Sequence, residues 1–300
     1  MEQNGEKAML DLVKKRWEGL SRLRGKLGDQ NIDYKAHGGY ELFHKHAGDY
    51  AKYKEYIPFF NNCLADIIGT KDVFMEVDDA TQFGFQNDVC LIKNTAEGQL
   101  HPGKMMQTLL HKTNHAGIQI YSGLMVKHIE EVSNQVNLHS DTFELSTKNL
   151  LIATNGFTNR LLPNLDLQPA RNQVIITKPI PELQLKGCFH YDKGYYYFRN
   201  VGNRILLGGA RNKAPLEETT DLFGTTKTIQ DALMDFMQST IMPNSSVEID
   251  YKWSGIMGVG DSKSPIVEKL SERIGLSIRL GGMGVAIGTL VGEEGANLFD

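Results

Sequence analysis

The sequence predicts a mixed α/β protein in which a block of mostly antiparallel strands lies between two segments that face a ligand. One such segment is the apolar strand 149–152, which stops at the turn Ala153-Thr-Asn-Gly156. Small polar residues after a buried strand are typical of a sheet edge that binds a ligand. The other segment is strand 274–280, which passes through Gly281-Gly-Met-Gly284 into a helix. Between them, residues 171–259 are mostly of β character.

The composition is that of an ordinary globular protein and excludes several classes of function. Of the 300 residues, 41% are hydrophobic and 23% are charged, with a net charge of -4, so we expect no nucleic acid partner. The longest apolar runs are too short to span a membrane. The polar, acidic start of the chain does not resemble a secretory signal, and a cytoplasmic location is expected.

Apolar spacing predicts the elements of the first half. Apolar residues at three- and four-residue steps predict a helix over 8–27, which Gly28 ends. Pro102 suits the first turn of another helix, which ends near Gly117. Further elements are expected at 34–43 (strand), 49–69 (helix broken at Pro58), 73–77, 89–92 and 118–121 (strands) and 126–145 (a small meander).

The β block contains an aromatic strand. Candidate strands are 173–177, 194–199, 204–208 and 247–253, with a helix near 226–240. Because side chains alternate between the faces of a strand, Tyr195, Tyr197 and Arg199 should share one face, and Tyr196 and Phe198 the other. An aromatic face with a guanidinium is suited to a substrate pocket. An ordinary sheet face with a paired arginine is the alternative.

The glycine run 281–288 is the strongest chemical signal. Glycines let the backbone approach a planar or charged group, and the helix start that follows offers free N–H groups. This suits a phosphate or a ring that gains negative charge on reduction. The run is not G-x-G-x-x-G, because Ile287 stands where the last glycine is needed. A glycine-rich helix start that only packs on a sheet is the alternative, as a simple tight turn is for 153–156.

The histidines and cysteines do not form recognisable metal motifs. His111 and His115 have helical spacing but lack the glutamate of H-E-x-x-H, and we expect both, with His44 and His46, to be exposed to solvent. The three cysteines, which are Cys63, Cys90 and Cys188, lie far apart and are expected to be buried as small apolar residues. The sequence has no P-loop and no G-x-S-x-G elbow.

Six segments, in order, resemble the FAD-dependent oxidoreductases of the D-amino acid oxidase and glycine oxidase family. They are Gly98-Gln-Leu-His-Pro-Gly-Lys104, the strand closing at Val126, Leu150–Gly156, the hairpin of Tyr197-Phe-Arg199 and Arg204–Gly209, Trp253-Ser-Gly255, and Gly281–Gly284. The resemblance implies an incomplete FAD-binding Rossmann-like domain beside a substrate domain with a large, mostly antiparallel sheet flanked by helices. It implies hydride transfer from the carbon bearing the amine to the flavin, followed by hydrolysis of the imine.

The resemblance also assigns residues. The implied cofactor residues are Val126, Ala153, Thr154, Gly156, Gly281, Gly282, Gly284, Val285 and Ala286, and the implied substrate residues are Tyr197, Arg199 and Met257. No obligatory catalytic side chain and no metal are implied, because the reaction depends on positioning. The implied organisation is a substrate-domain part at 1–97, a cofactor segment at 98–165, the substrate sheet at 166–260 and a second cofactor segment at 261–300.

Two departures from the family pattern modify these expectations. The family's opening βαβ unit with G-x-G-x-x-G is missing, so the chain resembles a member without its amino-terminal portion. A second chain could supply that unit, and the chain could form homo-oligomers. Met257 stands where amino-acid oxidases often carry an arginine for the substrate carboxylate. Either Arg199 replaces that arginine or the substrate is an amine without the carboxylate, so the substrate is left as an amine or an amino acid. A non-catalytic remnant that binds a small molecule is the alternative function.

Overall fold

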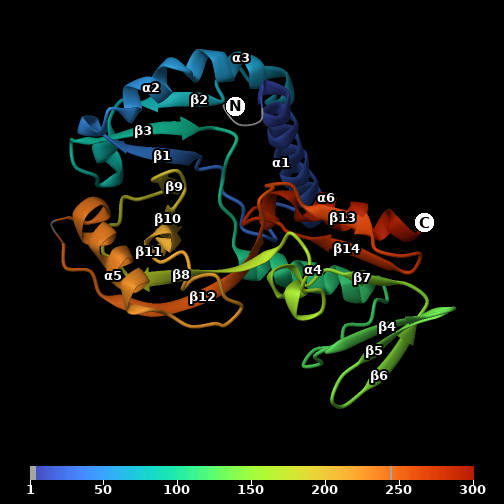
Figure 1. Ribbon diagram of the computed structural model, residues 1–300. Coiled ribbons are helices and arrows are strands. Elements are labelled where there is room, and N and C mark those ends of the chain that lie inside the picture. Colours follow the sequence, from blue (N-terminus) through green and yellow to red (C-terminus); the bar gives the residue numbers. More distant parts are fainter. Residues whose placement is uncertain (1–4, 244) are drawn as a thin grey trace.

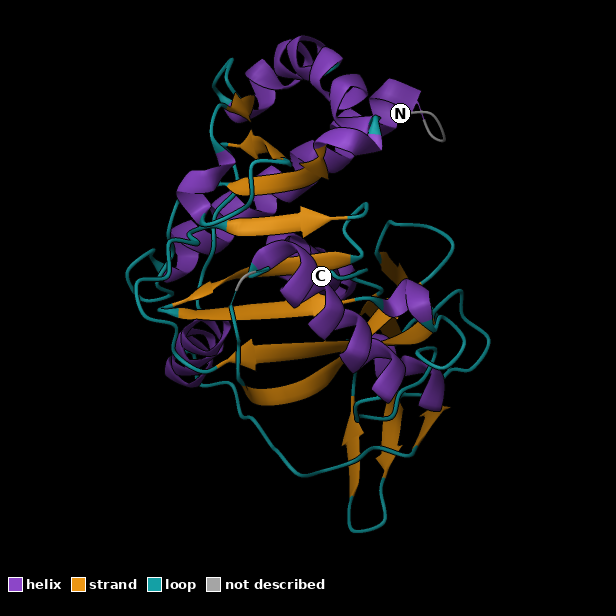
Figure 2. Ribbon diagram, turned by 90° about the vertical axis from the view of Figure 1, so that its left-hand side faces the viewer, coloured by secondary structure: helices purple, strands orange, loops and turns teal. Residues whose placement is uncertain are grey.

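The computed structural model describes residues 5–243 and 245–300 (Figure 1). A large curved sheet forms one side of the molecule, with α5 against one of its faces, and the helices α1 and α6 lie beyond its opposite face. A second, small sheet lies beside α6, and a third projects away from the body (Figure 2). The mixed α/β class and the large, mostly antiparallel sheet flanked by helices are therefore confirmed.

The helices follow the apolar spacing of the sequence. The chain of 49–69 divides at Tyr56, two residues before Pro58, as expected from a proline at the start of a helix. His101 caps α4 by accepting a hydrogen bond from the Lys104 N–H. The helices are α1 (Gly5–Leu27), α2 (Asp49–Glu55), α3 (Ile57–Ile68), α4 (Pro102–His115), α5 (Lys227–Phe236) and α6 (Gly284–Ala296), with a π-helical turn, η5, at Met237–Ile241 and short 3-10 turns that include η3 (Asn155–Arg160).

The large sheet has eight strands in the order β12-β8-β11-β10-β9-β1-β3-β2. Every neighbouring pair is antiparallel except β1 and β9. Its strands are β1 (Gly39–His44), β2 (Phe74–Val77), β3 (Val89–Asn94), β8 (Gln168–Thr177), β9 (Cys188–Tyr191), β10 (Tyr196–Val201), β11 (Arg204–Gly209) and β12 (Ile249–Val259).

The main hydrophobic core fills the face of this sheet that α5 covers. Phe189 and Phe198 stack with ring centroids 5.0 Å apart, and Tyr40 stacks on Phe189 from the other side at 4.8 Å. Phe236 of α5 contacts Phe198. Such aromatic pairs bury large areas and fix the register of the strands that carry them.

The two smaller sheets come from the segments around the β block. β13 (Ile266–Lys269), β14 (Ile274–Ile278) and β7 (Leu150–Ile152) form one, with β7 and β14 parallel. The expected meander forms the other, with β4 (His128–Val132), β5 (Gln135–His139) and β6 (Glu144–Thr147). The three expected segment boundaries, at 97, 165 and 260, fall in loops, and the division itself stays a prediction.

One predicted strand is wrong. Residues 118–121 belong to no strand, although their apolar character favoured one. A strand is defined by hydrogen bonds to a neighbouring strand, and residues 118–121 pair with none of the strands in the described sheets. Conversely, β9 and β13 were not predicted, because they are short and carry no clear alternation.

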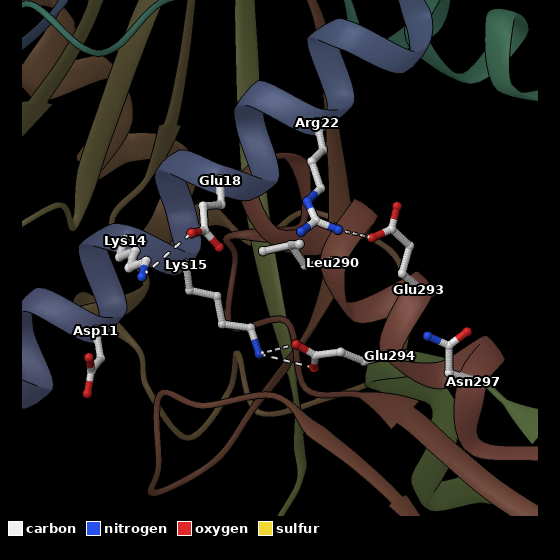
Figure 3. A pocket seen from close by; sticks show the side chains of 9 residues that line it. All are labelled: Asp11, Lys14, Lys15, Glu18, Arg22, Leu290, Glu293, Glu294 and Asn297. Carbon is white, nitrogen blue, oxygen red and sulfur yellow. Dashed lines mark hydrogen bonds and ion pairs between the residues drawn. The ribbon is translucent and has the colours of Figure 1, made fainter. Parts of the chain in front are cut away.

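Close packing of α1 on α6 holds the small sheet against the rest of the molecule. A Cβ on Gly19 would lie 2.1 Å from the Ala286 carbonyl oxygen, so only glycine permits this approach. Ion pairs extend the contact along a hollow of about 380 Å³ between the helices (Figure 3). Lys15 pairs with Glu294, and Arg22 and Lys26 pair with Glu293. No helix in the described residues is both long and apolar enough to cross a membrane.

Candidate functional site

The ends of β7 and β14 bring the two predicted cofactor segments together. The parallel register pairs Leu150 with Ile274 and Ile152 with Leu276, so both strands end at the same edge of the small sheet. The turn 153–156 follows one strand and the glycine run 281–284 follows the other. The two motifs therefore lie next to each other at the carboxyl ends of parallel strands, and their role in binding a cofactor stays a prediction.

Asn155 links this edge to the large sheet. Its backbone takes a positive φ of 45°, and its side-chain Oδ1 accepts a hydrogen bond from the Leu280 N–H at 3.1 Å. The Gly281 N–H donates to the Gly258 carbonyl oxygen at 3.1 Å. The end of β12 is therefore held directly against both turns.

Glycines are needed where these three segments meet. A Cβ on Gly156 would lie 2.6 Å from the Met257 carbonyl oxygen, and one on Gly258 would lie 2.7 Å from the Asn155 Oδ1. The Met257 sulfur lies 3.1 Å from the position of a Cβ on Gly282, whose φ is 79°. The structure thus brings Gly156, Met257 and Gly282, which were predicted separately, into one cluster.

The start of α6 offers free backbone donors at the same place. The N–H groups of Ala286 and Ile287 donate back to the Met283 carbonyl oxygen. Among the described residues, no acceptor receives the N–H of Gly284 or Val285. These two donors and the positive end of the helix dipole favour a group that carries or gains negative charge. Ala153, Thr154, Gly281, Gly282 and Val285 are exposed, so a ligand can reach this edge.

Val126 lies between α4 and β4 along the chain, and not in the turns that follow β7 and β14. It is half-buried and lies at the end of segment 118–126, which has no regular secondary structure, just before β4. The residues before it are exposed, including Ile118 (59%), Tyr121 (69%) and Met125 (58%). The expected strand that would present Val126 is not formed, and its cofactor role stays a prediction.

The alternation predicted for the aromatic strand is confirmed for β10. Tyr196 and Phe198 are buried in the core, whereas Tyr197 and Arg199 occupy the other face. Tyr195 lies just before the strand and is 43% exposed.

Tyr197 and Arg199 differ in how they are held. A Cβ on Gly208 of β11 would lie 2.6 Å from the Tyr197 hydroxyl oxygen, so the ring lies flat across that glycine. Burial raises the pKa of Tyr197 to about 12. Arg199 donates a hydrogen bond to the Leu100 carbonyl oxygen at 2.7 Å, so part of its guanidinium is already occupied.

The face that carries Tyr197 continues across the whole sheet. The cross-strand register joins Glu41, His190, Tyr197, Gly208, Val174 and Trp253 in one row. Burial raises the pKa of Glu41 to about 7, and the nearby Glu97 adds to the shift. Sequence reasoning missed Glu41 and His190, because a strand pattern does not reveal which strands will be neighbours.

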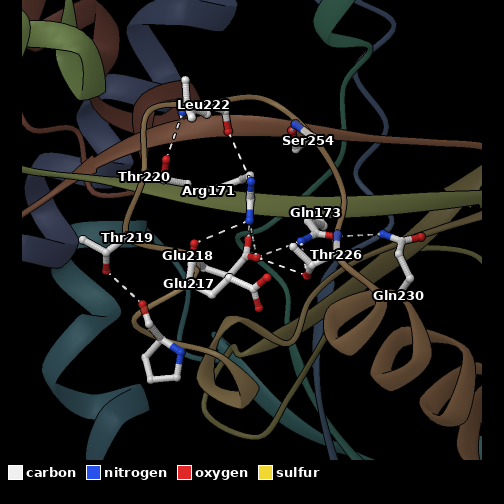
Figure 4. A network of polar contacts seen from close by, with 12 residues as sticks. Arg171, Gln173, Glu217, Glu218, Thr219, Thr220, Leu222, Thr226, Gln230 and Ser254 are labelled. Atoms are coloured by element: carbon white, nitrogen blue, oxygen red, sulfur yellow. Dashed lines mark hydrogen bonds and ion pairs between the residues drawn. The ribbon is translucent and has the colours of Figure 1, made fainter.

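On the opposite face of the sheet, polar side chains of β8 are hydrogen-bonded to other protein groups. Arg171 donates two hydrogen bonds to Glu218, at 3.0 and 2.8 Å, and Gln173 also donates to Glu218 at 2.8 Å (Figure 4). Both the Arg171 and Glu218 side chains are buried, and Thr226 completes the network with Gln173. This network fixes the loop between β11 and α5 against β8.

The histidines and cysteines do not form a site. His46, His111 and His115 are exposed as expected, but His44 is half-buried, because its ring contacts Asp88 at 3.1 Å. The three cysteines are free and half-buried, so the expectation of full burial is wrong. Among the described residues, no group of three or more histidine, cysteine or acidic side chains could hold a metal ion.

The glycine cluster fits one part of a flavin. Glycine backbone with no Cβ, next to two free N–H groups, suits the planar ring and its electron-rich edge. A G-x-G-x-x-G turn for the pyrophosphate is absent from the sequence. The two described hollows lie elsewhere, between α1 and α6 and beside Lys45, Tyr50 and Glu76.

Comparison with known proteins identifies relatives. A family model described as FAD dependent oxidoreductase matches residues 2–298. The "Probable oxidoreductase OrdL" of Rhizobium meliloti is 24% identical over 216 residues, which are 69% of this chain and 48% of that protein. The chain therefore spans about half the length of that curated relative.

Solved structures share the fold at low identity. A glycine oxidase from Bacillus cereus matches with a TM-score of 0.76 and 14% identity, over 96% of this chain and 82% of that chain. The L-proline dehydrogenase from P. horikoshii matches with a TM-score of 0.75 and 16% identity, over 95% and 78%. A glycine oxidase from Geobacillus kaustophilus matches with a TM-score of 0.76 and 17% identity, over 97% and 78%.

Proposed function

Because the chain belongs to the family of FAD dependent oxidoreductases, we propose that it oxidises the C–N bond of an amine or an amino acid, with FAD as the hydride acceptor. The observation that carries the proposal is the meeting of three segments at one edge. The turn 153–156, the glycine run 281–284 and Met257 of the large sheet are in direct contact there. Glycine oxidase and proline dehydrogenase neighbours support an amine-type substrate.

The chain's own residues would position the reactants. FAD, when bound, supplies the acceptor for the hydride. The N–H groups of Gly284 and Val285 would stabilise negative charge at the edge of the ring. Gly156 and Gly282 let their two turns pack against Met257, and this contact would shape the edge on which the ring lies. We assign no obligatory acid or base, because hydride transfer depends on alignment of the reacting atoms.

The large sheet would hold the substrate. Tyr197 and Arg199 occupy the face turned away from the core, and Met257 lies where that sheet meets the glycine cluster. A thioether cannot pair with a carboxylate as a guanidinium does. A small-molecule amine or amino acid therefore remains the substrate class of this proposal.

A further polypeptide unit would complete the cofactor site. In the described part of the chain, β7 pairs with β14 alone, so its other edge carries unpaired backbone groups. Exposed apolar side chains lie on the segment 118–125 and on α4, where Met106 is 51% and Leu110 is 44% exposed. Such surface is usually covered by another part of a protein. The unit could belong to the same polypeptide or to a second chain, and it would bind the pyrophosphate.

The absorption spectrum with and without added FAD tests the function. Visible flavin bands that stay with the protein through gel filtration, and that bleach when an amine is added without oxygen, would support it. Gly284→Leu should abolish flavin retention by blocking the start of α6. Gly292→Leu, on the same helix and facing open space, should not. Equal retention of flavin by both variants would remove the assignment of the glycine cluster.

A non-catalytic binding protein is the second candidate, and the absence of G-x-G-x-x-G favours it. It predicts a colourless chain that never takes up FAD, even with the missing type of βαβ unit supplied from a relative. Flavin uptake in that mixture would exclude it.

A further inference from the structure

Glu41 presents a carboxyl group on the proposed substrate face of the large sheet. Its neighbours along β1, Tyr40 and Leu42, are buried in the main core, so alternation places Glu41 on the opposite face. The parallel register of β1 with β9 sets it directly beside His190, whose partner on β10 is Tyr197. A ligand on the face of Tyr197 would therefore meet Glu41 two strands away, about 10 Å across the sheet.

The Glu41 carboxyl has no protein partner but is open to solvent. No described residue donates a hydrogen bond to it or forms an ion pair with it. None of the described polar atoms that are sealed from solvent without a partner belongs to Glu41 or His190, so water, and hence a ligand atom, reaches both groups. Asn172, on the same face of β8, differs in this respect, because its amide nitrogen is sealed. Glu41 is thus an unpaired acidic group that a ligand can contact.

The charges around Glu41 favour a cationic ligand. Gly39 is the next residue of β1 on this face, and the Glu97 carboxylate lies where a Cβ on Gly39 would be. The cation described beside Glu97 is Arg16 of α1, whose pKa burial lowers and Glu97 raises. Arg199 lies two strands away and already donates to a backbone carbonyl oxygen. Two carboxyl groups therefore share one guanidinium, and a positive group beside Glu41 would balance the second carboxylate.

An alkylammonium group matches these surroundings. A half-buried carboxylate is costly without a counter-ion, and burial raises the pKa of Glu41 to about 7, with a smaller contribution from Glu97. An ammonium group carries the missing charge and three N–H donors, and the carboxylate and a ring nitrogen of His190 can accept from it. A carboxylate ligand would instead be repelled by Glu41 and Glu97.

We propose that the Glu41 carboxylate binds the charged amino group of the substrate, and that the substrate is an amine without a carboxylate next to the reacting carbon. The proposal rests on the proposed function for the reaction at the C–N bond. Near neutral pH an amine reaches the protein as an ammonium ion, and it must lose one proton before hydride transfer. Glu41 can take that proton: the ammonium becomes a neutral amine, the carboxylate becomes a neutral carboxyl, and no electrons are exchanged.

Titration of the chain at pH 8 with three matched probes, followed by NMR, tests this inference. Hexan-2-amine carries the ammonium, norleucine carries in addition a carboxylate in place of a methyl group, and hexan-2-ol carries no charge. We expect hexan-2-amine to bind at least tenfold more tightly than either of the others, since a hydrogen bond to a charged group contributes about 1.4 kcal/mol or more. Glu41→Gln should remove this advantage and leave the binding of hexan-2-ol unchanged. Glu55→Gln, which removes an exposed carboxylate from α2, should alter the binding of no probe.

Urea unfolding at pH 8 separates a binding role from a structural one. Glu41→Gln keeps the shape of the side chain and removes an unpaired charge, so the variant should be at least as stable as the wild type. Equal binding of hexan-2-amine and hexan-2-ol, a preference for norleucine, or unchanged binding of hexan-2-amine by Glu41→Gln would overturn the inference. Flavin uptake is measured separately: a chain that binds hexan-2-amine through Glu41 but never binds FAD would refute the proposed function and leave the amine site standing.

Discussion

Glu41 on β1 should weaken the folded protein when it ionises. Burial, with a smaller contribution from Glu97, raises its pKa from 4.5 to about 7. No described residue forms an ion pair or hydrogen bond with it. Between pH 4.5 and about pH 7, Glu41 keeps its proton in the folded protein, whereas the same carboxyl has released its proton in the unfolded chain. The stability that the neutral carboxyl contributes is therefore complete below about pH 4.5 and is lost as the pH rises through 7.

The size of the effect follows from the shift. One pKa unit corresponds to about 1.4 kcal/mol, so a rise from 4.5 to about 7 corresponds to about 3 kcal/mol. Glu41→Gln keeps a neutral side chain of the same shape at every pH. We expect the variant to match the wild type near pH 4 and to exceed its free energy of unfolding by up to about 3 kcal/mol near pH 8.

Urea unfolding of both proteins across this pH range measures the difference. All other titrating groups are shared, so the difference isolates Glu41. Glu55→Gln, on the exposed surface of α2, serves as the control and should show no pH-dependent difference from the wild type. If the gap between Glu41→Gln and the wild type stays constant with pH, Glu41 is not desolvated in the folded protein and the reasoning fails.

Three further perturbations test the packing. Glu218→Gln strips the buried Arg171 of its counter-ion and should lower the free energy of unfolding by about 3–5 kcal/mol in urea titration; a loss below 1 would contradict the network. Gly19→Ala forces α1 away from α6 and should lower the free energy of unfolding by about 2 kcal/mol. Gly25→Ala, on the same helix with open space around it, should raise the free energy of unfolding by about 0.5–1 kcal/mol. Tyr121→Lys places a charge among the exposed apolar side chains of segment 118–125 and should reduce self-association in sedimentation velocity. Equal self-association of the variant and the wild type would show that this segment does not mediate contacts between copies of the chain.

Local patterns predicted the elements that depend on one stretch of chain. Apolar spacing predicted the long first helix, and a proline predicted the start of the helix at Pro102. Alternation predicted that Tyr196 and Phe198 share one face of their strand, which the structure shows to be the core face. These succeed because helix and strand periods are set by the backbone within a few residues. The same patterns predicted a strand at 118–121, which does not form, because a strand also needs a neighbour.

The candidate site was predictable in its parts. The turn 153–156, the glycine run 281–284 and Met257 each stood out in the sequence. Their contact depends on the parallel pairing of β7 with β14 and on the position of the end of β12. β7 and β14 lie more than one hundred residues apart along the chain. Sequence separation carries no information about such contacts.

The sequence by itself determined the class of fold, the helices and strands with strong periodicity, and the family, because all three are written in short motifs and their order. Only the tertiary structure decided which side chains are left without a partner. Asn172 and Glu41 look ordinary in the sequence, and whether a polar group is satisfied depends on every atom that packs around it.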